Sequence, residues 1–69
     1  MKVEWIEGFK IKTSVENNEI VISANKEGML SLAKQLMMLA KGDLGDHIHY
    51  NEHNSLEEGS SEMIIEKVL

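Results

Sequence analysis

One segment of the sequence, residues 25–42, has the repeat of an amphipathic helix, and short strand-like segments lie on both sides of it. Its hydrophobic residues recur at steps of three and four, which places them on one side of a helix. Asn25 precedes the repeat and is suited to cap the first free amides. We expect the hydrophobic side to pack against the strands. That side comprises Met29, Leu30, Leu32, Ala33, Leu36, Met37, Leu39 and Ala40, and the polar side comprises Lys26, Glu27, Ser31, Lys34, Gln35 and Lys41.

The residues before the helix alternate as a strand does. Hydrophobic residues and one threonine occupy odd positions from 3 to 15, and charged or polar residues occupy most even positions. Glu7 and Gly8 interrupt this pattern, so we expect a bulge or bend in a long first strand. Asn17-Asn18 then predicts a tight turn into a second strand at residues 19–24. A two-residue turn sets the register, in which the pairs are Val15 with Ile20, Thr13 with Ile22, and Ile11 with Ala24.

Two further strands are predicted after the helix. Residues 47–51 alternate, with Ile48 and Tyr50 facing the helix and His47, His49 and Asn51 facing the other way. Residues 52–61 are polar and contain glycine, so they are expected to form a loop in which Leu56 is the large hydrophobic anchor. Residues 62–69 have the composition of a strand, and the inward-facing set is either Met63 with Ile65 or Ile64 with Val68.

The predicted fold class is therefore α+β. The order β-β-α-β-β gives a four-stranded, mainly antiparallel sheet with one helix packed on one face. The 69 residues, 1–69, form a single domain, and a chain of this size buries only about 60% of the surface that its unfolded form exposes. The other face of the sheet would have no covering element and would meet water, a copy of itself or a partner.

The charge of the chain narrows the class of partner. Twelve acidic residues against seven basic ones give a formal charge of −5, which argues against nucleic acid or an anionic membrane as the main ligand. The chain has no cysteine, the first eight residues lack the uninterrupted apolar core of a signal peptide, and no stretch has membrane-spanning length. We therefore expect a cytoplasmic protein.

Few residues suggest chemistry. His47 and His49 would point to the same side of a strand, as a zinc or nickel pair does, but His53 or Glu52, the candidate third ligands, fall in the expected loop. No nucleophile lies on a recognisable strained turn, and Glu57-Glu58 would need a desolvated cleft that a single-layer sheet does not provide. The sequence predicts no catalytic residue, no metal site and no cofactor, and indicates a protein that is not an enzyme.

A partner-binding surface is the remaining expectation. Acidic residues are expected around one end of the third and fourth strands, where they would steer a basic protein. The strand histidines lie beside them on the uncovered face. The predicted partner-binding residues are Asp46, His47, His49, Glu52, Glu57 and Glu58.

Three segments resemble a family of small bacterial immunity proteins from polymorphic-toxin systems. They are residues 22–34 (ISANKEGMLSLAK), residues 47–49 (HIH) and residues 56–67, which contain LEEGS and EMIIEK. The resemblance spans most of residues 20–67 and does not extend to the first 18 residues. It implies that the chain binds and neutralises a cognate toxin made by the same cell, and it supplies no catalytic residues to carry over to this sequence. From the residues alone, a metal- or ligand-binding module built on the histidines and a homodimer formed through the open sheet face or a free edge strand remain open alternatives.

Overall fold

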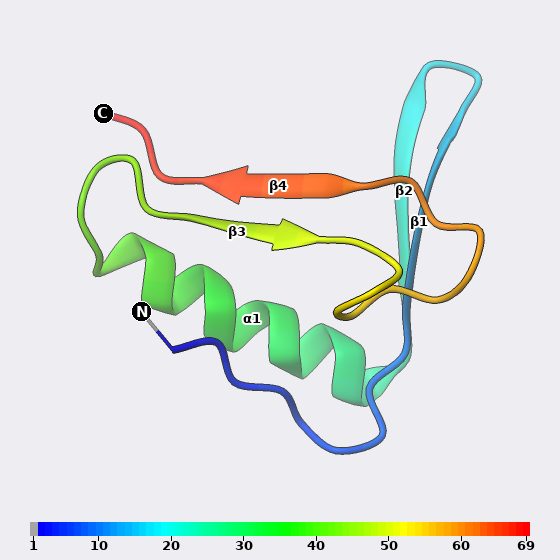
Figure 1. The fold of residues 1–69 in the computed structure, drawn as a ribbon, viewed down its shortest axis with the longest axis horizontal. Coiled ribbons are helices and arrows are strands. Elements are labelled where there is room, and N and C mark those ends of the chain that lie inside the picture. The colour runs from blue at the N-terminus through cyan, green and yellow to red at the C-terminus, as the bar shows by residue number, and fades with distance from the viewer. Residues whose placement is uncertain (1) are drawn as a thin grey trace.

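A computed structural model of the chain, which describes residues 2–69, has one helix and two hairpins (Figure 1). Strands β1 (Ile11–Glu16) and β2 (Glu19–Ala24) form the first hairpin, helix α1 (Lys26–Ala40) follows, and strands β3 (His47–Tyr50) and β4 (Met63–Glu66) form the second. The predicted α+β class and the order β-β-α-β-β are confirmed.

The β1–β2 hairpin has the register that the sequence predicts. Val15 lies opposite Ile20, Thr13 opposite Ile22 and Ile11 opposite Ala24. Asn17 and Asn18 both have positive φ angles, 51° and 65°, as a two-residue turn that matches the twist of the strands requires. The tip of this hairpin projects away from the helix (Figure 1).

The four strands do not form one sheet, and the expectation of a four-stranded sheet is wrong in this respect. β1 pairs only with β2 and β3 only with β4, both antiparallel, and the two hairpins lie side by side and run in different directions (Figure 1). The reason lies at the other edge of β1. The amide of Glu57 donates to the carbonyl of Ile11 at 2.9 Å, and the amide of Ser61 donates to that of Thr13 at 3.0 Å. The loop before β4 therefore occupies the edge that a third strand would need.

β3 and β4 resolve the inward-facing set that the sequence left open. Ile48 and Tyr50 are buried as predicted, and their cross-strand partners Ile65 and Met63 pack partly buried against the same core. Ile64 points the other way and is 59% exposed. The inward-facing set is therefore Met63 with Ile65, and not Ile64 with Val68.

Helix α1 is capped at its start as predicted, and a lysine that follows β4 bonds to its end. The Asn25 side-chain oxygen accepts from the Gly28 amide at 2.8 Å. Just after β4, Lys67 donates through Nζ to the carbonyls of Ala40 and Gly42, at 2.9 and 2.7 Å. These carbonyls lie at the negative end of the helix dipole, where a cation is stabilising. The chain after β4 is thus fixed to the end of the helix.

The helix does not bury the face that its hydrophobic pattern predicts. The buried residues of α1 are Gly28, Ser31, Gln35 and Leu39, and both Ser31 and Gln35 are 0% exposed. Met29 and Met37, which the pattern directs to the core, are each 59% exposed. The expectation that the whole hydrophobic side packs inward is wrong. Of that side, Leu39 is buried and Leu32 is partly buried.

The N-terminal segment explains this orientation. Residues 2–10 form no strand, so the long first strand expected from residue 3 begins only at Ile11. Without a neighbouring strand, its backbone finds partners on the helix: the Ile6 amide donates to Ser31 Oγ at 2.8 Å, and Gln35 Nε2 donates to the Glu4 carbonyl at 2.9 Å. The two buried polar side chains of α1 thus satisfy an irregular segment of backbone.

The core lies between α1, the N-terminal segment and the β3–β4 hairpin. Its buried hydrophobic side chains are Ile11, Leu39, Ile48, Tyr50 and Leu56. Tyr50 is 1% exposed, its hydroxyl donates to Gln35 Oε1 at 2.6 Å, and its ring meets that of Trp5 edge-on with centroids 6.1 Å apart. Burial raises the pKa of Tyr50 to about 12, because desolvation disfavours the phenolate.

Candidate partner-binding surface

The outward face of the β3–β4 hairpin is the first part of the candidate surface. His47 lies opposite Glu66 and His49 opposite Ile64, and all four residues are exposed. The rings of His47 and His49 meet edge-on with centroids 4.9 Å apart, and His47 Nδ1 lies 2.9 Å from the Gly45 carbonyl oxygen. Helix α1 lies on the opposite side of the hairpin (Figure 1). This face therefore combines imidazole, carboxylate and aliphatic groups that a partner can reach.

The loop between β3 and β4 is the second part, and its own hydrogen bonds hold its shape. The Asn51 carbonyl accepts from the amides of Asn54, Ser55 and Leu56, at 3.3, 3.0 and 2.9 Å. Leu56 is buried in the core and anchors the middle of the loop, as the sequence predicts. The loop is therefore a fixed part of the fold.

The acidic turn of this loop is held at both ends. The Glu57 and Ser61 amides bond to the edge of β1, and the Glu52 carboxylate accepts from the Gly59 amide at 2.6 Å. Gly59 has a φ of +87°, a conformation that favours glycine and allows the tight turn after Glu58. Glu57 and Glu58 are exposed. Because the backbone of the loop is already ordered, little conformational entropy is lost when these carboxylates bind a partner.

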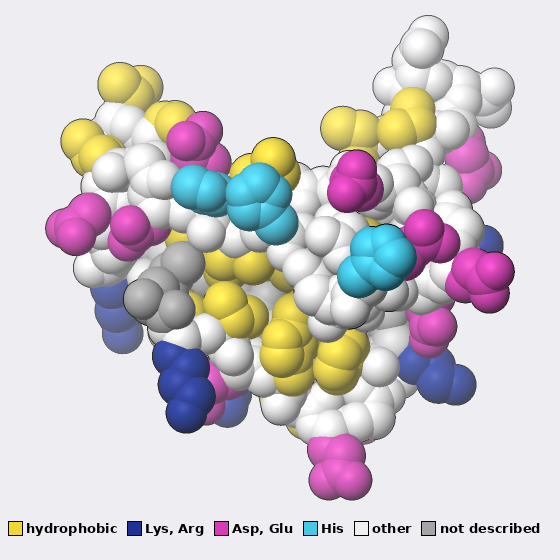
Figure 2. Space-filling model, viewed as in Figure 1, with side chains coloured by type: hydrophobic (Ala, Val, Ile, Leu, Met, Phe, Trp, Pro, Cys, Tyr) yellow, Lys and Arg dark blue, Asp and Glu magenta, His cyan; other side chains and the backbone are white. Residues whose placement is uncertain are grey.

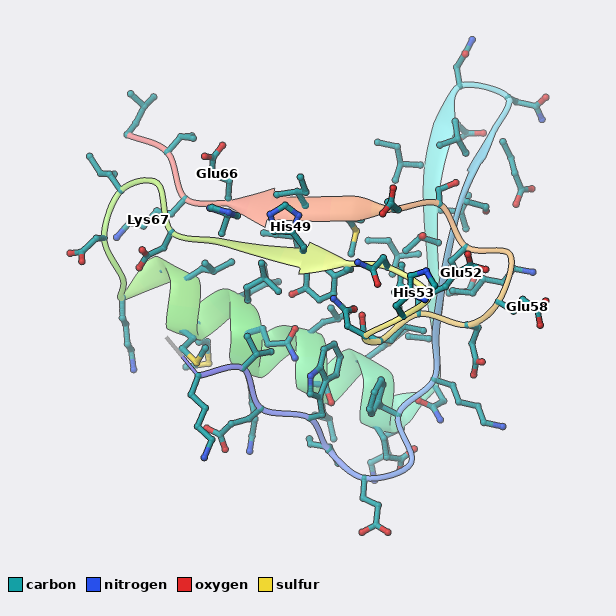
Figure 3. The ribbon with its side chains drawn as sticks, in the orientation of Figure 1. His49, Glu52, His53, Glu58, Glu66 and Lys67 are labelled. Carbon is teal, nitrogen blue, oxygen red and sulfur yellow. The ribbon has the colours of Figure 1, made fainter. Side chains whose placement is uncertain are left out.

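The six residues predicted to bind a partner lie in two groups. Figure 3 shows Glu52 and Glu58 together at the β1 end of the loop, and His49 further along the hairpin. Asp46 precedes β3, so it lies at the far end of the hairpin, next to Lys67. The expected gathering of all the acidic residues around one end of the strands is wrong for Asp46, because β3 separates it from the loop.

Asp46 also has a structural task that the sequence did not indicate. Its Oδ2 accepts from the Asp43 amide at 2.9 Å, and its carbonyl accepts from the Lys67 amide at 2.9 Å. Of the six predicted residues, Asp46 is partly buried, and Glu52, Glu57, Glu58, His47 and His49 are exposed and open to a partner.

The three histidines do not converge. His53 lies in the loop, where its amide donates to the Asn51 side chain at 2.9 Å, and Figure 3 shows it apart from His49. Across residues 2–69, no three histidine, cysteine or acidic side chains are placed to hold a metal ion together. His47 and His49 thus form a pair without a third ligand in the described part of the chain.

A hollow between the two hairpins is a feature that sequence reasoning missed. It has a volume of about 240 Å³ and is lined in part by Val15, Ile20 and Ile64. Figure 2 shows the molecule notched between the hairpins, with hydrophobic side chains on both sides of the notch. The register predicts that Val15 and Ile20 are neighbours, but it does not predict their exposure. That exposure follows from the split into two sheets.

One of the comparisons with known proteins gives a match. A family model described as Immunity protein 32 matches residues 19–68, which include β2, α1, the β3–β4 hairpin and the acidic loop. No curated protein and no solved structure matches the chain. Within residues 2–69, the helix falls short of the length and apolar character needed to cross a bilayer.

Proposed function

The chain belongs to the family described as Immunity protein 32, and on that premise we propose that it neutralises a cognate bacterial toxin by binding it in a stoichiometric complex. The family match is the observation that carries the proposal. It covers the acidic loop and the open face of β3–β4. The chain would act in the cytoplasm and would inhibit by covering a surface of the toxin.

The proposed contact surface consists of the acidic loop and the strand histidines. Its residues are those predicted from the sequence: Asp46, His47, His49, Glu52, Glu57 and Glu58. Two features support it. Glu57 and Glu58 are exposed on a loop fixed by backbone hydrogen bonds, and the whole chain carries a charge of −5. A fixed negative surface steers a basic partner and raises its association rate.

A charge-reversal variant tests this proposal. The reading frame next to the gene of this chain is first examined for a large protein with a toxin-like C-terminal domain. The chain is then mixed with that domain, and association is followed at several salt concentrations. We expect Glu57→Lys/Glu58→Lys to slow association at low salt by about 10-fold or more and to flatten its salt dependence. Survival of cells that produce both proteins measures neutralisation directly.

The matched control reverses the charge of two glutamates outside the acidic loop. Glu4→Lys/Glu7→Lys shifts the net charge by the same amount on the exposed N-terminal segment, outside the family match. If both double variants associate equally fast, the loop is not the contact surface. If the unaltered chain neither binds that domain nor protects cells from it, the proposed function itself is wrong for this pair.

A further inference from the structure

Strand β2 has an outer edge to which no other strand pairs within residues 2–69. The strand has six residues and is bonded only to β1. The outer edge of β1 is different, because the amides of Glu57 and Ser61 bond to it. The strands of the other hairpin also have unpaired edges, but each of them has only four residues. β2 therefore presents the longest unpaired strand edge in the described part of the chain.

The backbone groups of Ile20 and Ile22 point to this outer edge. In an antiparallel pair, residues bond to the facing strand at every second position and point outward at the positions between. The Asn25 amide donates to the Lys10 carbonyl at 3.1 Å, so the bonded positions of β2 are the odd-numbered ones. The alternation on β1 agrees, because the carbonyls that accept from the loop are the ones expected to point outward. The amides and carbonyls of Ile20 and Ile22 are thus available to an added strand.

The edge of β2 lacks the features by which proteins prevent strand pairing. Those features are charged side chains, proline, bulges and very short strands. Residues 20–24 contain no charged residue and no proline, and their pairing with β1 runs without a bulge. Ile20 is 78% exposed and Ile22 is 44% exposed. An edge of this kind favours pairing with another chain.

The hollow between the hairpins lies on the apolar side of this edge. Ile20 lines the hollow together with Val15 and Ile64, and Ile22 shares the face of the hairpin with Ile20 because it lies two positions further along the strand. Residues directly opposite each other in an antiparallel sheet point to the same face. An added strand would therefore continue this surface best with apolar side chains opposite Ile20 and Ile22.

The polar side of the edge favours a basic partner. Glu16 and Glu19 lie directly opposite each other beside the turn, and both are exposed. Like charges at opposite positions are destabilising. A lysine or arginine on the added strand, opposite Glu19, would offset this repulsion. The charge of −5 on the whole chain acts in the same direction.

A second copy of the chain does not supply this cation. Antiparallel pairing of two β2 edges would join their even-numbered outward positions, so the residue opposite Glu19 would be odd-numbered. None of the candidates within reach of β2 carries a positive charge. They are Val21, Ser23, Asn25 and Glu27. The charges at this edge therefore favour a different, basic protein over a second copy.

We propose that the outer edge of β2 binds an extended segment of the toxin as an added antiparallel strand, with apolar residues opposite Ile20 and Ile22 and a lysine or arginine opposite Glu19. This inference rests on the proposed function and specifies how the toxin is held. The acidic loop bonds to the other edge of β1, so three strand spacings, about 15 Å, separate it from the added strand. An interface of ordinary size, about 800 Å² on each partner, spans that distance, so one toxin domain contacts both surfaces.

Amide hydrogen exchange, followed by NMR, tests the proposal on the unaltered chain. The chain is measured alone and with the toxin-like C-terminal domain encoded next to its gene. We expect the amides of Ile20 and Ile22 to exchange rapidly in the free chain and at least about 10-fold more slowly in the complex. The amides of Val21 and Ser23 bond to β1, so they serve as the internal control and should be protected in both samples.

The outcomes separate this inference from the proposed function. If the complex forms but the amides of Ile20 and Ile22 exchange as in the free chain, the edge is not the contact and the inference is wrong, while the proposed function stands. If the domain does not bind, both are wrong for this pair. If the two amides become protected as the concentration of the chain alone rises, a second copy occupies the edge and the inference is overturned.

A pair of substitutions at one position tests the role of the backbone. Ile22→Pro removes an outward amide and leaves the bonds to β1 in place, a position at which edge strands tolerate proline. Ile22→Thr keeps the amide and a β-branched side chain. We expect the dissociation constant for the toxin domain to rise by about 10-fold or more with proline and by less than about threefold with threonine. Equal effects would contradict strand addition. Urea unfolding checks the fold, and if proline unfolds the chain, the exchange measurement decides.

The predicted cation has its own test in Glu19→Lys. The matched control is Glu7→Lys, which makes the same charge change at an exposed position of the N-terminal segment. We expect Glu19→Lys to raise the dissociation constant for the toxin domain about threefold or more above that of the control. Equal dissociation constants for the two variants would show that no cation lies opposite Glu19 and would overturn the proposed chemistry of the bound segment.

Discussion

The two faces of helix α1 reverse the usual distribution of polar and hydrophobic residues. The buried face carries Ser31 and Gln35, both fully buried, whereas the exposed face carries Leu36 and Met37. The polar residues are buried because the irregular N-terminal segment needs hydrogen-bond partners, which Ser31 Oγ and Gln35 Nε2 supply. The hydrophobic residues are exposed because the core lies on one side of the helix, and that side is the one that carries Ser31 and Gln35.

This contrast shows that the orientation of a helix depends on what its neighbours need as well as on its own hydrophobic pattern. In a strand that is paired in a sheet, the backbone groups are already hydrogen-bonded to the neighbouring strand. A helix could then cover such a strand with its hydrophobic face. A segment without strand pairing requires polar side chains at the interface, and unpaired buried backbone groups would cost more than the exposure of a leucine.

The largest expected effect is on the buried face. Gln35→Leu keeps nearly the same volume but leaves both the Tyr50 hydroxyl and the Glu4 carbonyl without their partner. Each of the two unsatisfied groups costs about 1–3 kcal/mol, so we expect a loss of roughly 2–6 kcal/mol in the free energy of unfolding. Denaturation by urea measures it. A change below about 1 kcal/mol would mean that the buried hydrogen bonds do not set the orientation of the helix.

The second effect tests how closely the buried face is packed. A Cβ at Gly28 would lie 2.6 Å from the Lys10 carbonyl oxygen and 2.9 Å from Ile11 Cγ1. Gly28→Ala gains about 1 kcal/mol of helix propensity, but the backbone clash should exceed this gain and leave a net destabilisation of about 1–2 kcal/mol. Thermal unfolding compared with Lys34→Ala, an exposed control on the same helix, measures the difference. A stabilised Gly28→Ala protein would contradict the close contact between α1 and the start of β1.

The third effect is the dependence of stability on alkaline pH. The pKa of Tyr50 is raised from 10.0 to about 12 in the folded chain because burial disfavours the phenolate. Since the unfolded chain ionises first, the contribution of Tyr50 to stability is complete below pH 10 and is lost as the pH rises through about 12. Tyr50 is the only tyrosine, so its absorbance reports this titration alone.

The control for the alkaline effect is Tyr50→Phe. This variant lacks the phenol and should lose the additional decline in stability between pH 10 and 12 that the unaltered chain shows. A tyrosine absorbance that titrates near pH 10 in the folded protein would show that the hydroxyl is not buried against Gln35.

The hairpins and the helix could be predicted from the sequence because local signals define them. Asn17-Asn18 fixes the turn and so the register of β1 and β2, and Asn25 marks the start of the helix. The odd-numbered hydrophobic residues before Ile11 predict a strand equally well, and there the prediction is wrong. Trp5 and Phe9 do pack at the core, with stacked rings 4.4 Å apart, but the segment that carries them pairs with no strand. Between them, the Ile6 amide donates to Ser31 Oγ and the Ile6 carbonyl accepts from the Phe9 amide in a turn.

The division into two sheets could not be predicted, because it depends on contacts that are distant in sequence. The amides of Glu57 and Ser61 bond to β1, more than 40 residues earlier, and no local pattern indicates this pairing. The same contacts fix the acidic loop of the candidate site. The sequence therefore identifies Glu57 and Glu58 as exposed and charged but does not show that they are rigidly held.

The smallest expected effect, and the sharpest contrast with Gln35, is at the adjacent position. Leu36→Gln places an amide on the exposed face of α1, where it meets water, and the helix propensities of the two residues are nearly equal. We expect the free energy of unfolding, measured by urea denaturation, to change by less than about 0.5 kcal/mol. If Leu36→Gln costs as much as Gln35→Leu, the helix is oriented as its hydrophobic pattern suggests and the contrast between its faces is wrong.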